Sequence, residues 1–320
     1  MVGYIRSVRA AAGTCLTLLA LAHPASAQDK PPETDPYTYG EVYSVEYVMV
    51  PVAVRGEKPG ERLPKDRFTL NVDGKPVKID SFTNDDSAPI SLIFLQDLSG
   101  SMAEPGKMES SRESIDCFLD TARKGDEISL ATFASAGTDV DVPLTGDVSA
   151  VREAMTLWEP WGKTALYDAV SMLPEISLGT SGGKKAAILI TDGVDNASGI
   201  DPAQAQRIVQ SAEIPVYVLS LVSHDPEAAT DPATPRFRAL LQQLAETTGG
   251  RFFDLAEPGE ARRTCSSILG ELRHQYMLGF TVTGTGPATY HPIRVDLRKP
   301  GRHVSLVHRR GYRGTAPEPS

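Results

Sequence analysis

Residues 88–102 read Ala-Pro-Ile-Ser-Leu-Ile-Phe-Leu-Gln-Asp-Leu-Ser-Gly-Ser-Met, an apolar run followed directly by a polar segment. The apolar run at residues 90–95 is typical of a strand that is buried on both faces. It ends in Asp97, Ser99 and Ser101, a carboxylate and two hydroxyls at alternate positions. Oxygen ligands of this kind suit Mg²⁺, Mn²⁺ or Ca²⁺. The stretch therefore predicts hard-metal ligands at the carboxyl end of a buried strand, although a capped loop before the next helix is the alternative.

An α/β pattern follows this strand. Apolar runs typical of buried strands recur at residues 128–133, 186–190 and 216–222. Helical spacing of apolar residues lies around them, at 107–122, 164–176, 202–213, 237–248 and 261–275. Strands that alternate with helices predict a mostly parallel, doubly wound sheet covered on both faces. We expect this α/β domain to span residues 88–275.

The two flanks of the α/β pattern are rich in β signals. Residues 40–86 and 276–313 alternate apolar and polar side chains, and Asp73-Gly74 is a strong hairpin signal. Neither flank has enough strands to bury a core alone. Because the ends of an inserted domain often lie close together, we expect both flanks to form one antiparallel β domain that carries the α/β domain as an insertion.

The first 27 residues have the features of a secretory signal peptide. Arg6 and Arg9 precede an apolar run at 10–22, and Ala25-Ser26-Ala27 is a small-x-small cleavage site. We expect cleavage after Ala27, a linker at 28–39, a tail at 314–320 and a secreted or periplasmic protein. The formal charge is −9, and loss of the two arginines would leave −11, which argues against nucleic acid as a partner.

Candidate metal ligands come from three places in the α/β pattern. Asp97 and Asp192 each end an apolar strand, and Thr164 begins a predicted helix between them. Ligands of open parallel sheets bind beyond the carboxyl ends of the strands. Two carboxylates that meet there repel each other unless a cation lies between them. The pattern predicts a divalent-metal site at this edge.

Enzyme motifs are weaker. Phosphatases with a nucleophilic Asp use a second carboxylate two residues on, where this chain has Ser99. The Gly-x-Ser-x-Gly pattern at residues 179–183 follows a predicted helix, whereas a nucleophile elbow follows a strand. We therefore expect no enzyme, and a metal-dependent hydrolase remains the alternative.

The order Asp97-x-Ser99-x-Ser101, Thr164, Asp192 resembles the metal-ion-dependent adhesion site of von Willebrand factor type A domains, over residues 90–275. The resemblance implies that Ser99 and Ser101 bind Mg²⁺, or Mn²⁺ or Ca²⁺, directly. It implies that Thr164 binds directly or through water, and that the two carboxylates act mostly through water. One coordination position then remains for an Asp or Glu carboxylate of a protein partner.

The flanks add a narrower resemblance, to the exported bacterial VWFA-related family first named from acidobacteria. It rests on Phe68, on Asp73-Gly74-Lys75-Pro76, on Arg-His-Gln-Tyr-Met-Leu-Gly at 273–279 and on Arg310-Gly311-Tyr312. The expected function is an exported, metal-dependent protein-binding module. A structural module that assembles an envelope complex is a further alternative.

Partner contacts are expected beside the metal. Trp158 and Trp161 flank Pro160 just before Thr164, either as core packing or as an aromatic rim. The loop at residues 223–235, with Asp225 and Asp231, leaves a strand at its carboxyl end and so belongs to the metal face.

Two cysteines, Cys117 and Cys265, remain after the signal peptide. An even number in an exported chain suggests a disulfide. The resemblance implies that the first and last helices of the α/β domain pack side by side, which would allow the bridge. Two unpaired thiols are the alternative.

Overall fold

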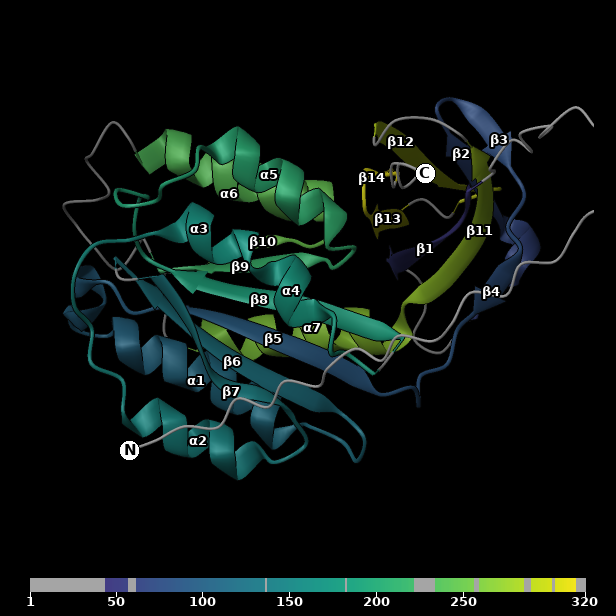
Figure 1. The fold of residues 1–320 in the computed structure, drawn as a ribbon. Coiled ribbons are helices and arrows are strands. Elements are labelled where there is room, and N and C mark those ends of the chain that lie inside the picture. Colours follow the sequence, from purple (N-terminus) through teal and green to yellow (C-terminus); the bar gives the residue numbers. More distant parts are fainter. Residues whose placement is uncertain are drawn as a thin grey trace, which may run out of the picture. The chain divides into compact units, whose positions relative to one another are not determined.

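The computed structural model describes residues 44–56, 62–135, 137–181, 183–221, 234–255, 259–284, 289–300 and 303–314. Between them the described residues form an α/β domain and an antiparallel β domain (Figure 1). The predicted signal peptide and linker lie outside the described residues, as does the tail after Gly314. None of the described helices is long and apolar enough to cross a membrane.

A six-stranded sheet forms the centre of the α/β domain, in the order β10-β9-β8-β5-β6-β7. Five strands are parallel, and β7 is antiparallel at one edge, where it pairs with β6. All eight residues of β5 are buried, as the apolar run predicts. The strands are β5 (Ile90–Asp97), β6 (Glu127–Ala134), β7 (Gly137–Thr145), β8 (Lys184–Thr191), β9 (Val216–Ser220) and β10 (Phe252–Asp254).

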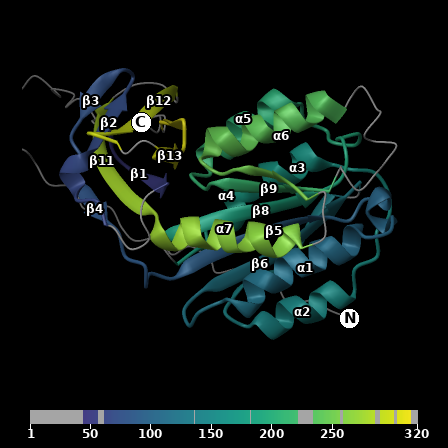
Figure 2. The same ribbon diagram turned by 180° about the vertical axis from the view of Figure 1, so that it is seen from behind.

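Helices cover both faces of this sheet, which confirms the doubly wound prediction. Alternate residues of β5 point to opposite cores: Leu92 and Phe94 to one, Ile93 and Leu95 to the other. The first core is closed by α1 (Lys107–Asp120), α2 (Val148–Thr156) and α7 (Glu260–His274), which face the viewer in Figure 2. The second is closed by α3 (Leu166–Ser171), α4 (Leu173–Ser177), α5 (Pro202–Ser211) and α6 (Thr234–Thr248).

One predicted helix is wrong in its bounds. The spacing predicts a single helix over residues 164–176, but the structure has two short ones, α3 and α4. Pro174 lies in the first turn of α4, and because proline has no backbone N–H, the first helix cannot continue through it. At its other end α3 begins only at Leu166, so Thr164 lies in the loop ahead of α3 rather than inside a helix.

Both flanks build one β domain, as predicted. Its two four-stranded sheets have the orders β13-β1-β11-β4 and β14-β12-β2-β3, and they enclose a shared apolar core. Each sheet mixes strands from before and after the α/β domain. The strands are β1 (Ser44–Arg55), β2 (Phe68–Val72), β3 (Lys75–Val77), β4 (Ser81–Thr83), β11 (Tyr276–Gly284), β12 (Tyr290–Leu297), β13 (Ser305–His308) and β14 (Gly311–Arg313).

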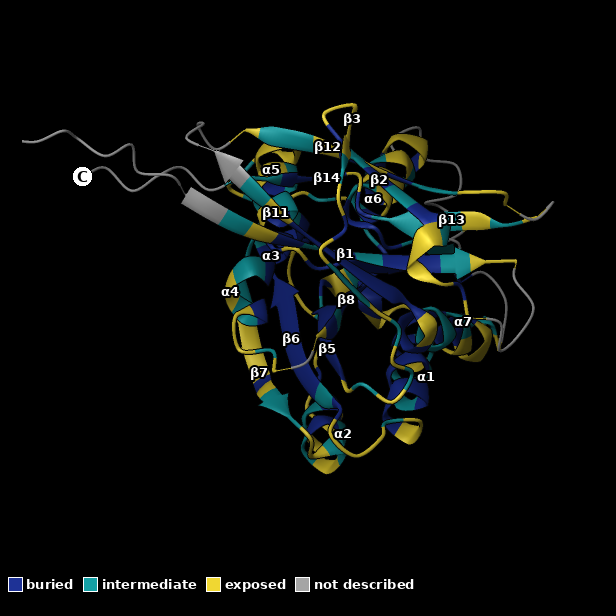
Figure 3. Ribbon diagram, turned by 90° about the vertical axis from the view of Figure 1, so that its right-hand side faces the viewer, coloured by how far each residue is buried: buried dark blue, intermediate teal, exposed yellow. Residues whose placement is uncertain are grey.

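The α/β domain is inserted between β4 and β11, and these two strands pair in an antiparallel register that includes Leu278 with Phe82. The two connections therefore leave the β domain side by side. In Figure 3 the central strands of the α/β domain are almost entirely buried, whereas in the strands of the β domain buried residues alternate with more accessible ones. This alternation is what one solvated face predicts.

Helix α7 is fixed near both ends. A disulfide joins Cys265 of α7 to Cys117 of α1, with the two Cα atoms 6.3 Å apart. In the last turn of α7, Arg273 forms a buried ion pair with Asp126, the residue before β6. Burial raises the pKa of Asp126, but hydrogen bonds from Arg273 and from the N–H groups of Arg123 and Ile90 outweigh it and hold the pKa below its ordinary value.

Loss of the Arg273–Asp126 pair should destabilise the protein strongly. In Arg273→Leu the carboxylate of Asp126 stays buried without its partner, which costs about 3–5 kcal/mol. Urea denaturation should show this loss. The matched variant Arg294→Leu breaks an exposed pair with Asp296 and should cost about 1 kcal/mol or less. Equal losses in the free energy of unfolding would contradict the larger contribution expected of the buried pair.

The same pair predicts a pH dependence. The folded-state pKa of Asp126 is depressed, so its contribution to stability should be complete above the ordinary carboxyl pKa of about 4. It should be lost as the pH falls through the lower, folded-state pKa. Unfolding curves between about pH 2 and 5 should therefore converge for wild type and Arg273→Leu at the acidic end.

The disulfide gives a further prediction. Cys117 and Cys265 are 148 residues apart, and cross-links of long loops typically contribute about 2–4 kcal/mol. Cys117→Ala with Cys265→Ala should lower the melting temperature, and a reducing agent should lower it for wild type but not for the double variant. Non-reducing peptide mapping that finds both thiols free in the exported protein would contradict the bridge.

Candidate functional site

The five predicted ligands come together at the carboxyl edge of the parallel sheet. Asp97 is the last residue of β5, and Asp192 follows β8, the strand paired with β5. Ser99 and Ser101 lie in the turn after β5, where a short 3-10 helix, η2 (Gly100–Ala103), begins. Thr164 reaches the same edge from the turn before α3. Three chain segments thus supply two carboxylates and three hydroxyls.

Asp97 is completely buried and fixed by both of its oxygens. The backbone N–H of Ser99 donates to Oδ1 at 2.8 Å, and the hydroxyl of Thr191 donates to Oδ2 at 2.6 Å. Burial raises the pKa of Asp97 to about 6; the Thr191 hydrogen bond opposes this rise, and the charge of Asp192 adds to it. Asp192 is thus close enough to disfavour the negative charge of Asp97, as expected for a site that gains from a cation.

The hydroxyls converge beside Asp192. The hydroxyl of Ser101 donates to Asp192 Oδ1 at 2.9 Å and lies 3.3 Å from the hydroxyl of Ser99. A Cβ atom added to Gly193 would lie 3.2 Å from Thr164 Oγ1 and 3.7 Å from Ser101 Oγ. Both hydroxyls therefore border one small space, which the missing side chain of Gly193 leaves open.

Backbone hydrogen bonds join the loops that carry these groups. The N–H of Gly100 donates to the carbonyl of Gly162 at 3.0 Å, and the N–H of Trp161 donates to the carbonyl of Leu98 at 2.8 Å. The side chain of Asn196 accepts from the N–H of Thr164 at 2.9 Å. These bonds fix the turn after β5 against the turn before α3, so the hydroxyls are held in place before any ligand arrives.

A further charged residue at this edge is Lys107, the first residue of α1, which the metal-ligand pattern does not include. Its ammonium is almost completely buried and donates to Asp192 Oδ2 at 2.6 Å, while Glu104 Oε2 lies 2.6 Å away on the other side. Burial lowers the pKa of Lys107, but hydrogen bonds and charges of Asp192 and Glu104 outweigh it and raise the pKa. The signal in the sequence was a lysine directly before the apolar residues of a predicted helix. This signal is weak, because lysines in such positions usually lie in solvent.

The donor set fits a hard divalent cation. It consists of hydroxyl and carboxylate oxygens, the ligands that Mg²⁺ and Ca²⁺ prefer. Among the described residues no three His, Cys, Asp or Glu side chains group as metal ligands, because this site has only two acids and uses hydroxyls for the rest. The donor set therefore does not suit a soft metal, or a metal whose binding requires several charged ligands.

The predicted partner residues differ in exposure. Trp158 is only 7% exposed and packs in the core with Arg112 over its ring, so for this residue the core-packing alternative holds. Trp161 is 57% exposed beside the metal edge, where Val194 is 37% exposed. Asp225 and Asp231 lie outside the described residues.

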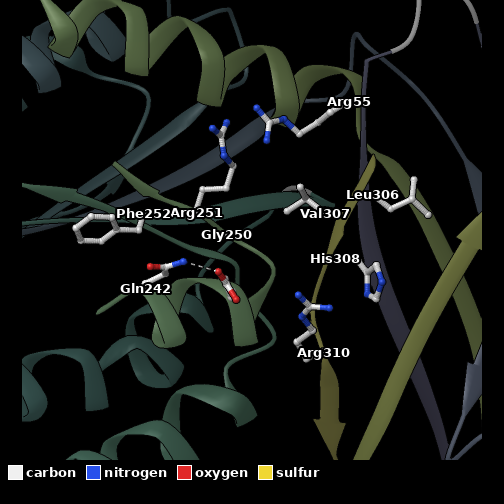
Figure 4. Close-up of a pocket in the computed structure, with 10 residues that line it drawn as sticks. Arg55, Gln242, Gly250, Arg251, Phe252, Leu306, Val307, His308 and Arg310 are labelled. Atoms are coloured by element: carbon white, nitrogen blue, oxygen red, sulfur yellow. Dashed lines mark hydrogen bonds between the residues drawn. The ribbon is translucent and has the colours of Figure 1, made fainter. Parts of the chain in front are cut away.

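A cavity of about 360 Å³ lies elsewhere, at the opposite edge of the sheet (Figure 4). Arg55, Arg251 and Arg310 line it together with residues of α6 and β13, and Glu271 forms ion pairs with Arg55 and Arg251. Residues 250 and 251 precede β10, so this cavity lies at the amino ends of the parallel strands. This cavity is therefore separate from the edge where the predicted ligands lie.

Residues 92–194 match the family model of the von Willebrand factor type A domain. No curated protein matches the chain. The matched segment runs from β5 to just past β8 and contains all five predicted ligands.

Solved structures are similar at low identity. An aerotolerance-related membrane protein from Bacteroides fragilis is 19% identical, with 57% of this chain and 98% of that chain covered and a TM-score of 0.45. BatB from Bacteroides thetaiotaomicron is 18% identical over the same shares, with a TM-score of 0.46. A von Willebrand factor type A protein from Catenulispora acidiphila is 14% identical, with 88% and 76% covered and a TM-score of 0.49.

The space beside Gly193 can be tested directly. Gly193→Ala adds a methyl group 3.2 Å from Thr164 Oγ1, so calorimetry should show Mn²⁺ binding weakened by about tenfold or more, roughly 1.4 kcal/mol. The control is Gly183→Ala, whose added methyl group would have no atom within 4 Å. An unchanged Mn²⁺ affinity in Gly193→Ala would show that the cation does not bind in this space.

Proposed function

We propose that the von Willebrand factor type A domain of this chain binds a divalent cation, most simply Mg²⁺, through Asp97, Ser99, Ser101, Thr164 and Asp192, and through that cation an Asp or Glu side chain of a protein partner. The observation that carries the proposal is the convergence of three hydroxyls and two carboxylates at one sheet edge, with Ser101 bonded to Asp192 at 2.9 Å. In this proposal the protein is an interaction module rather than an enzyme.

The contacts of the two acids favour a partner carboxylate. Both oxygens of Asp97 already accept hydrogen bonds from the protein, and both oxygens of Asp192 accept from Ser101 and Lys107. The neutral hydroxyls are therefore the natural direct ligands, and the acids would act through water. A cation held in this way keeps much of its charge and attracts an anionic ligand.

The surroundings define the partner further. Trp161 and Val194 are exposed on the two loops that border the site. A partner segment with an acidic residue next to an apolar one would use both the cation and this rim. Because the chain carries a net charge of −9, an acidic partner gains little from long-range attraction, and binding should depend on the cation.

The place of action follows from two features. The predicted signal peptide and the disulfide between Cys117 and Cys265 both suit export to an oxidising compartment. We therefore place the interaction in the periplasm or outside the cell.

A pull-down from envelope extract with the full mature chain tests this function. A partner should be retained in Mg²⁺ and lost in EDTA and in Ser99→Ala. Trp161→Ala should weaken retention about tenfold or more, whereas Leu178→Ala should not, because Leu178 is 84% exposed on the loop before β8, at the other end of the sheet.

Two outcomes would replace the proposal. A partner retained equally in EDTA would mean that the domain binds by a metal-independent surface, as a purely structural assembly module would. Turnover of phosphate esters, esters or peptides with Mg²⁺ that is lost in Asp97→Ala would favour the hydrolase.

A further inference from the structure

Two lysines of the α/β domain are almost completely buried, Lys107 at 1% and Lys184 at 2% exposure. Burial of an ammonium group is costly unless it is paired and hydrogen-bonded. The two residues meet this need differently. Lys184 donates to the backbone carbonyls of Asp85 and Arg273, at the amino end of β8. Lys107 instead forms ion pairs with Asp192 and Glu104, at the carboxyl edge where the metal ligands lie.

We propose that Lys107 is the internal cation of the metal site: its ammonium balances Asp192 so that the edge folds without metal, and it weakens the hold on a divalent cation so that the metal stays exchangeable. The part about metal affinity rests on the proposed function. The part about metal-free stability does not.

The carboxylate of Asp192 links the two cations. Its Oδ2 accepts from the Lys107 ammonium at 2.6 Å, and its Oδ1 accepts from the hydroxyl of Ser101 at 2.9 Å. A divalent cation bound at the Ser101 hydroxyl must therefore share this carboxylate with an ammonium group on its other oxygen. Two positive charges on one buried carboxylate repel each other, because screening by water is weak there.

Without metal the same ammonium is stabilising. Asp97 and Asp192 are both buried at the ends of the paired strands β5 and β8, so their two negative charges repel each other there. Lys107 is the cationic side chain that the structure pairs with Asp192. Glu104, with a side chain 46% exposed, covers the ammonium from the solvent side and leaves it bonded to two carboxylates.

The two buried lysines allow a matched test on the full mature chain. Lys107→Met and Lys184→Met each replace a buried ammonium by an apolar side chain of similar length. Both should lower the melting temperature in EDTA. Only Lys107→Met should gain Mn²⁺ affinity, by about tenfold or more in calorimetry, and should show a larger rise in melting temperature on addition of Mg²⁺ than wild type. Lys184→Met should keep the wild-type Mn²⁺ affinity.

The outcomes separate the possibilities. If Lys107→Met binds Mn²⁺ with the affinity of wild type, or more weakly, the proposal is overturned, because Lys107 would then only position Asp192. If Lys107→Met does not fold in EDTA, recovery of its fold when Mn²⁺ is added supports the proposal. If neither Lys107→Met nor Lys107→Gln recovers its fold with Mn²⁺, the result counts against the proposal. If wild type binds no Mn²⁺, the proposed function fails and the affinity claim fails with it, while the EDTA melts still decide the stability claim.

Discussion

Two carboxylates at the ends of neighbouring buried strands set the main constraint on this protein. β5 and β8 pair along almost their whole length, and Asp97 and Asp192 are therefore brought to the same edge of the sheet. Burial of these two carboxylates would be costly if their negative charge were not compensated. Thr191 and Ser99 donate to Asp97, and Ser101 and Lys107 donate to Asp192. The loops that carry Ser99, Ser101 and Thr164 are in turn fixed to one another, so one electrostatic requirement organises the whole edge.

Much of the fold was predictable because burial leaves a direct mark on sequence. β5 and β8 carry apolar runs and are almost completely buried because helices cover both faces of the sheet, and the flanks alternate because one face of each β sheet is solvated. The convergence of the predicted ligand residues at one edge followed from the rule that parallel strands present their carboxyl ends together. The family match over residues 92–194 agrees with this pattern.

Other features depend on contacts that sequence spacing does not record. The break between α3 and α4 at Pro174 is local, yet the apolar spacing continued through it and masked the break. Trp158 and Trp161 are three residues apart, and only the packing of the segment after α2 decides that one is buried and the other exposed. Lys107 pairs with Asp192, 85 positions away in the chain, and no local pattern contains that contact.

The insertion of the α/β domain between paired strands has a mechanical consequence. β4 and β11 run antiparallel, and the two chain segments that lead into the α/β domain leave this pair at the same end. A force that pulls the α/β domain away from the β domain would separate β4 from β11 starting at this end, breaking their hydrogen bonds one after another. Lys184 and Arg309 oppose this, because Lys184 bonds the carbonyls of Asp85 and Arg273 at the junction and Arg309 bonds Glu213. A pulling force would therefore load the side-chain contacts of Lys184 and Arg309 as well as the strand pair.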